Sequence, residues 1–286
     1  MATGVVESHG DRGVPIRGPS ALADDHRRAI TLTLALAKSD FKLRFFGSVL
    51  GYVWQLMRPL MLFGVLYVVF TVAGFTSGPH FPVALLLGIV LYTFFAEATG
   101  GAVGCVMVRE NLVRKIHFPR IVIPMAVVLV ACFNLALNLV VVVIFATASG
   151  VELSLAWLSL VPLMALLVVF ASGLALLLSA LYVRYRDVEP IWDVVLQITF
   201  YASLILVPYE VIEPKSEALA TGLLINPLAA IIQESRHLII DPAYVSASDG
   251  LGGAALLIVP LALLLGSVAL GLWVFNREAP RIAEEL

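Results

Sequence analysis

The chain has 286 residues, of which 60% are hydrophobic and 13% are charged, and its formal net charge is −2. This composition excludes an ordinary water-soluble domain and predicts that a lipid bilayer is the main solvent of the chain. The apolar stretches leave no connecting segment long enough to bury a core of its own, so we expect one membrane domain.

The first 58 residues lack the apolar core and cleavage site of a signal peptide, and we expect a solvated cytoplasmic tail over residues 1–28. From residue 29 to 46, apolar residues recur at helical spacing among charged ones, which predicts an amphipathic helix in the cytoplasmic interface. Leucines on its opposite face fit a helix wedged between bilayer and protein. A plain extension of the first span is the alternative. The apolar stripe consists of Ile30, Leu34, Ala37, Phe41 and Phe45.

The remainder of the chain predicts an all-α integral membrane protein with six transmembrane helices. A helix needs about 20 mostly apolar residues to cross ~30 Å of hydrocarbon, and six segments meet or approach that length. The proline at position 208 interrupts the fifth of them, so we expect the chain to break near residues 208–214. The predicted spans are 59–75, 81–108, 121–148, 156–183, 191–212 and 251–275.

The orientation follows from the basic residues in the connections. All but two of the 18 Lys and Arg lie on segments that share one side of the bilayer, and the exceptions are Lys215 and Arg236. Because basic connections stay in the cytoplasm, we expect a multi-pass protein of the inner (plasma) membrane with both termini cytoplasmic.

Motifs of intrinsic catalysis are missing from the sequence. None of the four lysines follows a glycine, so the phosphate-binding Walker loop is absent, and neither HExxH nor GxSxG occurs. We therefore expect a protein that is not an enzyme and carries neither a cofactor nor a metal. Cys105 and Cys132 fall inside predicted spans without CxxC spacing, and we interpret them as small core residues.

Glu97 is the clearest ionisable residue within the predicted spans. An ionised carboxylate is costly in hydrocarbon, so such residues pair with another group or face a cavity. Two interpretations stay open: a neutral or paired structural residue, and a lumen-facing group that contacts substrate. Three glycines nearby, at positions 100, 101 and 104, favour close helix packing.

The segment LRFFGSVLGYVWQLMRPL, residues 43–60, matches the pattern R-x-x-G-S-x-L-G-x-x-W-x-x-x-x-P at every defined position. It resembles the start of the permease subunits of ATP-binding-cassette exporters for polysaccharides and teichoic acids. Trp54 suits the membrane interface, and Pro59 can start or kink the span. We assign Arg44, Trp54 and Arg58 to the interface helix and the entrance of the transport path.

A second match lies in NLVRKIHFPR, residues 111–120, which is similar to the N-L-V-x-K-x-x-F-P-R run of that family. The resemblance implies a short cytoplasmic coupling helix that docks on an ATPase subunit. A basic loop that merely obeys the positive-inside rule is the alternative. The expected contact residues are Glu110, Asn111, Arg114, Lys115, His117, Phe118, Pro119 and Arg120.

Two further segments, VRYRD at 183–187 and NPLAAIIQESR at 226–236, also resemble the family. The second implies short re-entrant gate helices on the extracytoplasmic side, before the last span. Asn226 is suited to cap such a helix with Pro227 at its first position. We expect Arg236 to meet anionic lipid or polymer phosphate there, or else to be a solvated surface residue.

The resemblance covers residues 29–286 as a single permease domain and implies a homodimer. Each copy associates with an ATPase subunit, which binds ATP and Mg²⁺, so two copies of that subunit are expected. The implied cargo is a polyprenyl-linked glycan such as cell-wall galactan, O-antigen or a teichoic-acid-like polymer. The other expected contacts are with membrane lipid, and no nucleic-acid partner is expected.

Aromatic faces pack on sugar rings without demanding one hydrogen-bond pattern, so aromatic side chains in the spans are candidates for lining the passage between copies. Each of them could instead pack on a neighbouring helix or face lipid. A permease of a drug or small-lipid exporter with the same fold is one rival interpretation, and a membrane-embedded enzyme or scaffold is another. The candidates are Tyr67, Phe70, Phe94, Phe95, Trp192, Phe200 and Tyr201, together with Glu97.

Overall fold

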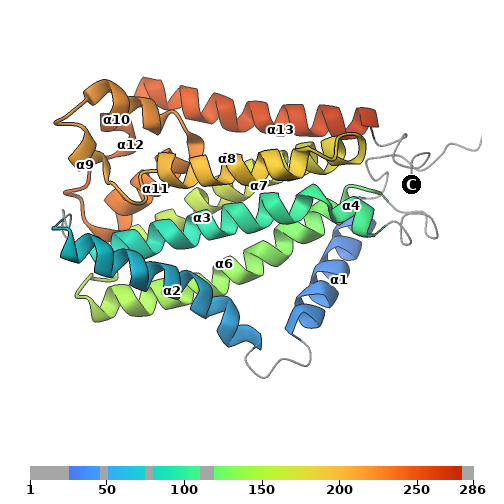
Figure 1. The fold of residues 1–286 in the computed structure, drawn as a ribbon, viewed down its shortest axis with the longest axis horizontal. Helices are drawn as coiled ribbons and strands as arrows, with labels where there is room; N and C mark the ends of the chain where they lie inside the picture. Colours follow the sequence, from blue (N-terminus) through green and yellow to red (C-terminus); the bar gives the residue numbers. More distant parts are fainter. Residues whose placement is uncertain (1–25, 46–50, 75–79, 110–118, 279–286) are drawn as a thin grey trace, which may run out of the picture.

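The structure, a computed structural model, describes residues 26–45, 51–74, 80–109 and 119–278, and every regular element in these ranges is helical (Figure 1). Most of the longer helices run side by side as a bundle, and most of the short helices gather at one end of it. The long helices are α1 (His26–Phe45), α2 (Gly51–Val72), α3 (Phe81–Val103), α6 (Val122–Ala148), α7 (Leu160–Arg184), α8 (Val188–Ala202) and α13 (Ile258–Glu278). The short ones are α4 (Cys105–Val108), η1 (Leu155–Ser159), α9 (Tyr209–Ile212), α10 (Glu217–Leu224), α11 (Pro227–Ser235), η2 (Arg236–Ile240), α12 (Ala247–Gly250) and η3 (Ala254–Leu257).

Within the described ranges, five helices are long and apolar enough to cross a membrane, and the number rises to six if the bent pair formed by α10 and the α11–η2 segment counts as one span. The predicted span 191–212 breaks earlier than the expected residues 208–214. α8 ends at Ala202, before Pro208, because Leu204 adopts a left-handed backbone with φ of 56° that a helix cannot continue. Pro208 then precedes the next helix, α9, as its N-cap.

The helix expected over residues 29–46 is present as α1, although it begins three residues earlier, at His26. Residues 26–28 are therefore helical and do not belong to a tail, while residues 1–25 lie outside the described part. Ala37 is buried against α6, and the Phe41 ring meets Phe133 edge to face at 5.5 Å between centroids. Ile30 is 61% exposed. One face of α1 thus packs on protein, and its place in the membrane interface stays a prediction.

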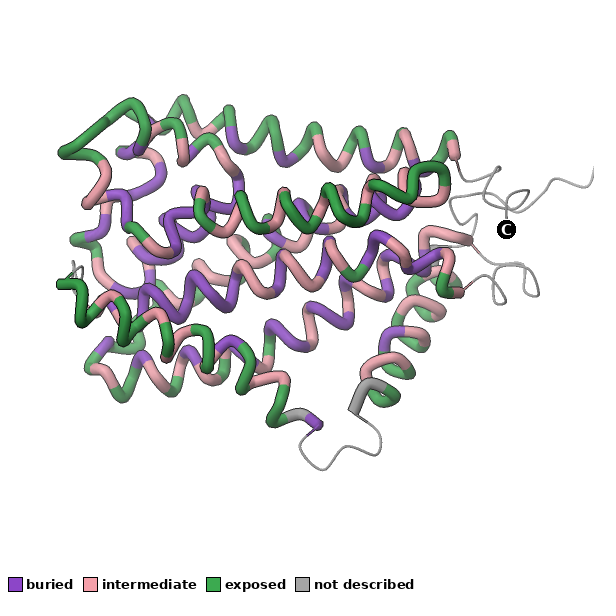
Figure 2. Tube along the Cα trace, in the orientation of Figure 1, coloured by how far each residue is buried: buried purple, intermediate pink, exposed green. Residues whose placement is uncertain are grey.

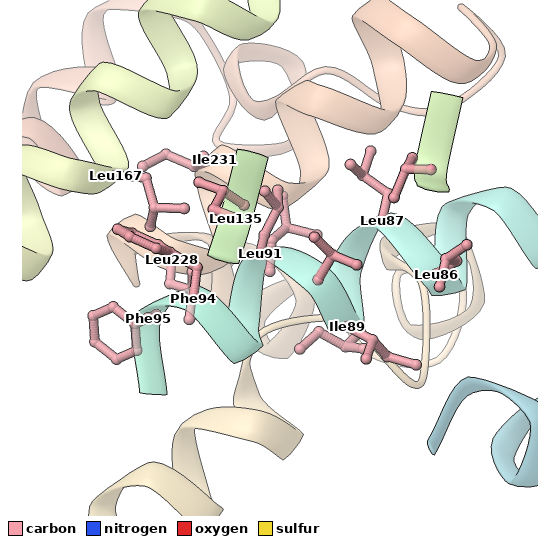
Figure 3. Packing of buried hydrophobic residues seen from close by; sticks show 14 of the residues in the cluster. Leu86, Leu87, Ile89, Leu91, Phe94, Phe95, Leu135, Leu167, Leu228 and Ile231 are labelled. Atoms are coloured by element: carbon pink, nitrogen blue, oxygen red, sulfur yellow. The ribbon is translucent and has the colours of Figure 1, made fainter. Parts of the chain in front are cut away.

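α3 lies at the centre of the bundle, with 72% of its spanning window buried, against 6% for the first span and 17% for the last (Figure 2). It is apolar nearly all round, as a helix surrounded by others must be. Leu91 and Phe94 of α3 share one cluster with Leu135 of α6, Leu167 of α7 and Leu228 of α11 (Figure 3). Cys105 is buried and Cys132 is half-buried; both thiols are free and pack in apolar clusters.

The tightest helix contact joins α7 to α13 at two glycines. A Cβ on Gly271 would overlap the carbonyl oxygen of Gly173, and a Cβ on Gly173 would lie 2.7 Å from the Val268 Cα. Lipid tails are as apolar as leucine, so helices in a bilayer associate through close van der Waals contact. The two glycines allow that contact where any side chain would prevent it.

Replacing Gly271 with alanine is expected to push α7 and α13 apart and to lower the free energy of unfolding by about 1–3 kcal/mol. Unfolding of the purified full chain in mild detergent measures the loss. Gly266→Ala is the matched control on the same helix, because a Cβ there meets nothing within 4 Å. Equal losses in the two variants would contradict the close-contact explanation.

Candidate functional site

The bent pair near the end of the chain contains α10 and α11, whose axes differ by 99°. The bend follows from the local sequence: the Asn226 side-chain oxygen accepts a hydrogen bond from the Leu228 amide at 3.0 Å, and Pro227 occupies the first turn of α11. The predicted cap at Asn226 is therefore confirmed. That these short helices act as a gate stays a prediction.

Arg236 follows α11 directly and is 1% exposed, so both sequence interpretations of it, as a solvated residue or as one exposed to lipid or polymer, are wrong. Its guanidinium donates to the carbonyl oxygens of Leu204 at 2.6 Å and Ile205 at 3.2 Å. It also reaches the Ala84 carbonyl of α3 at 3.5 Å. Leu204 and Ile205 lie in the irregular chain just after α8, where their carbonyls have no helical partner, and the buried guanidinium serves as their donor.

Carboxyl groups near Arg236 hold the loop after η2 against α11. Glu210 Oε1 accepts from the Gln233 side chain at 2.9 Å and from the Val245 amide at 2.8 Å. Glu234 Oε2 accepts from the Ala247 amide at 2.9 Å. Burial raises the pKa of Tyr244, in the same loop, to about 12.

A second polar cluster lies at the centre of the bundle around Glu97 of α3. One carboxyl oxygen accepts from the Gln55 side chain of α2 at 2.6 Å, and the other from Asn134 of α6 at 2.8 Å. Asn138 in turn donates to the Asn134 carbonyl at 2.9 Å. The geometry supports the paired structural interpretation of Glu97, which joins three helices.

The structure separates the aromatic residues predicted to line a passage. Phe94 and Phe95 are each 2% exposed, and Phe95 stacks on Phe170 at 5.4 Å between centroids. A residue buried within one copy cannot line a space between two, so the lining prediction is wrong for both. Tyr67 and Tyr201 are exposed at 36% and 70%.

The other three aromatics are half-buried. The ring centroids of Phe70 and Phe81 lie 6.2 Å apart, and Phe200 meets Tyr92 edge to face at 4.9 Å between centroids. Trp192 donates its indole N–H to the Thr99 hydroxyl at 3.1 Å, which joins α8 to α3. The lining role of these three stays a prediction.

The predicted coupling turn falls mostly on residues 110–118, which lie outside the described part of the chain. Pro119 and Arg120 are half-buried at the start of α6. On the other side of the turn, Arg109 forms an ion pair with Asp40 of α1. The turn is therefore anchored to α6 at one end and to α1 at the other.

Among the residues assigned to the entrance, Trp54 is 60% exposed and Arg58 is also exposed, one helical turn later on α2. Arg44 belongs to α1, and its side chain lies outside the description. Sequence reasoning missed Gln55, Asn134 and Glu210. The signal available for all three was a polar side chain inside or beside an apolar stretch.

A family model and individual relatives both point to the same family. A family model described as ABC-2 type transporter matches residues 31–240. An O-antigen export system permease protein RfbA from Klebsiella pneumoniae is 28% identical over 211 residues, which cover 73% of this chain and 80% of that protein. A protein of the same name from Myxococcus xanthus is 28% identical over 202 residues, covering 70% of this chain and 77% of its own length.

Replacing Arg236 with glutamine should leave carbonyls at the end of α8 without donors and lower the free energy of unfolding by about 3 kcal/mol. A cysteine introduced at Ile205, which is 0% exposed, should then react with a water-soluble thiol reagent. Lys215→Gln is the control, since Lys215 is the other cation near this end and is exposed. An unreactive cysteine in the Arg236 variant would refute the proposed support.

Replacing Glu97 with glutamine removes one of two acceptor oxygens, and we expect a loss of about 1 kcal/mol in unfolding free energy. Glu97→Ala should lose more unfolding free energy than Glu97→Gln, and Asn134→Leu should lose about as much as Glu97→Ala. Export and stability are measured on the same preparations, and export should follow the amount of folded protein. A glutamine variant that is fully stable yet inactive would instead assign Glu97 to the cargo.

Proposed function

The chain belongs to the ABC-2 type transporter family and is the permease subunit of an ATP-binding-cassette polysaccharide exporter, and we propose that its cargo is a polyprenyl-linked glycan moved between two copies of this chain. The proposal includes an orientation with both termini in the cytoplasm and the α9–α12 end outside the inner membrane. The exported polymer resembles O-antigen, cell-wall galactan or teichoic acid in being a sugar chain on a lipid carrier.

The observation that supports this proposal is that the rest of the chain does not cover the outer surfaces of α2 and α8. None of the residues of α8 is buried, although the helix is apolar over most of its length. Val194, Ile198 and Tyr201 are exposed at 55%, 61% and 70%. A second copy that faces these helices would cover part of this surface, and the remainder would border a passage along the two-fold axis.

Sugar rings suit the exposed aromatic side chains on this surface. Tyr67 and Tyr201 present ring faces on which a pyranose or furanose can pack, while their hydroxyl groups stay available for hydrogen bonds. Such contacts tolerate many sugar sequences. This tolerance is needed if a polymer is to slide past them. The lipid carrier of the polymer would cross or follow at the boundary between the passage and the bilayer.

ATP and Mg²⁺ act on the partner subunit in this proposal, and the coupling turn at 110–120 receives the motion. The Arg109–Asp40 ion pair would pass a displacement of the turn to α1, and Arg120 would pass it to α6. α8 is attached to α3 through two polar contacts, Trp192 to Thr99 and the Tyr92 hydroxyl to the Leu196 carbonyl at 2.8 Å. These contacts hold α8 to α3, so the two helices would move together.

Depletion of this chain in its own cells is expected to cause a lipid-linked glycan to accumulate on the cytoplasmic face. Extraction and chemical analysis of polyprenyl-linked sugars identifies the polymer. Accumulation of a small lipid or drug, with glycan export unchanged, would contradict the proposed cargo.

The same cells test the coupling turn. Lys115→Glu should reduce co-purification of the ATPase subunit several-fold, because a like charge at a docking surface repels its partner. Lys215→Glu, at the opposite end of the bundle, is the control and should leave co-purification unchanged. Stable assembly of the Lys115 variant with full ATPase activity would remove the turn from the interface.

A further inference from the structure

α7 and α13 touch at Gly173 and Gly271 and enclose a groove toward the end where both helices begin. α11 forms the base of this groove. The groove has a volume of about 280 Å³. Its described walls are Leu163, Leu166, Pro227, Ala230, Ile231, Glu234, Ala247, Leu257, Pro260, Leu261 and Leu264.

The groove opens sideways, away from the bundle. Its base is buried, with Ile231 at 6% and Leu264 at 3% exposure, whereas Leu166 and Leu261 are exposed at 37% and 43% on its two sides. Both flanking helices are candidate spans, so the opening faces the hydrocarbon of the bilayer. An apolar groove in that position is filled by a hydrocarbon chain and not by water.

The polar end of the groove selects the occupant. Glu234 is the one charged side chain among the described lining residues, and it is half-buried beside Ala247, the first residue of α12. The irregular backbone of residues 241–246, just before α12, is of the kind that lies at the level of the lipid headgroups. A carboxylate there can accept hydrogen bonds from the ammonium group of a zwitterionic lipid, whereas an anionic lipid offers only its phosphate and no compensating positive charge.

We propose that the groove between α7, α11 and α13 is a binding site for an amine-bearing phospholipid, with one acyl chain between the helices and its ammonium group at Glu234. α2 and α8, on which the proposed cargo path runs, contribute none of the described lining residues. The occupant is therefore a membrane lipid and not the lipid carrier of the cargo. Binding would hold α11, and with it Arg236, against α7 and α13.

Photolabelling tests the proposal on the full chain assembled with its ATPase subunit. The vesicles consist of phosphatidylcholine with a trace of phosphatidylethanolamine or phosphatidylglycerol that carries a diazirine in the acyl chain. We expect the ethanolamine probe to label residues 163–166 and 257–264 about tenfold more than the glycerol probe does. Equal labelling by the two probes would overturn the assignment of the headgroup.

Variants locate the site. Leu261→Trp should block labelling by filling the mouth, whereas Leu263→Trp should not, because Leu263 is a similarly exposed leucine of α13 (49%, against 43% for Leu261) that does not line the groove. Glu234→Gln should reduce the preference between probes to near unity while acyl-chain labelling persists. Labelling that survives Leu261→Trp, or that excess polyprenyl phosphate displaces, overturns the proposal.

Discussion

In a bilayer, each backbone carbonyl freed by a broken helix needs a donor from the protein itself, and this requirement is concentrated where α8 stops at Ala202. Arg236 meets it with a buried guanidinium that reaches two freed carbonyls and a third on α3. A cation without such acceptors would be expelled from this position. The break in α8, the placement of α11 and the contact with α3 therefore depend on one another.

Directional contacts are few among the spans, and they fix what apolar packing leaves free. Leucine and valine faces slide past one another with little change in energy, whereas a hydrogen bond in hydrocarbon fails within an ångström or so of displacement. Glu97 fixes α3 relative to α2 and α6, and Arg236 fixes its beginning relative to α8. The central helix α3 is thus held at two points along its length. The positions of its neighbours along the helix axis are set by these contacts.

Sequence alone predicted the features that depend on length and local pattern. Five of the six expected spans follow from apolar length, α1 from helical spacing, and the start of α11 from an Asn-Pro cap. The end of α8 was not predicted, because Leu204 adopts a left-handed conformation that the sequence usually signals with a glycine. The burial of Phe95 and Arg236 also escaped, since a residue's surroundings in a bundle depend on partners distant in sequence.

The length of α8 has a consequence for the membrane around it. Its 15 residues extend about 22 Å at 1.5 Å per residue, which is shorter than the ~30 Å of hydrocarbon in a typical bilayer. Lipid cannot solvate the irregular chain beyond Ala202, and protein covers it instead, since Ser203, Leu204 and Ile205 are 0%, 1% and 0% exposed. The remaining depth of the bilayer beside α8 must then be filled by the short helices that follow it in the chain.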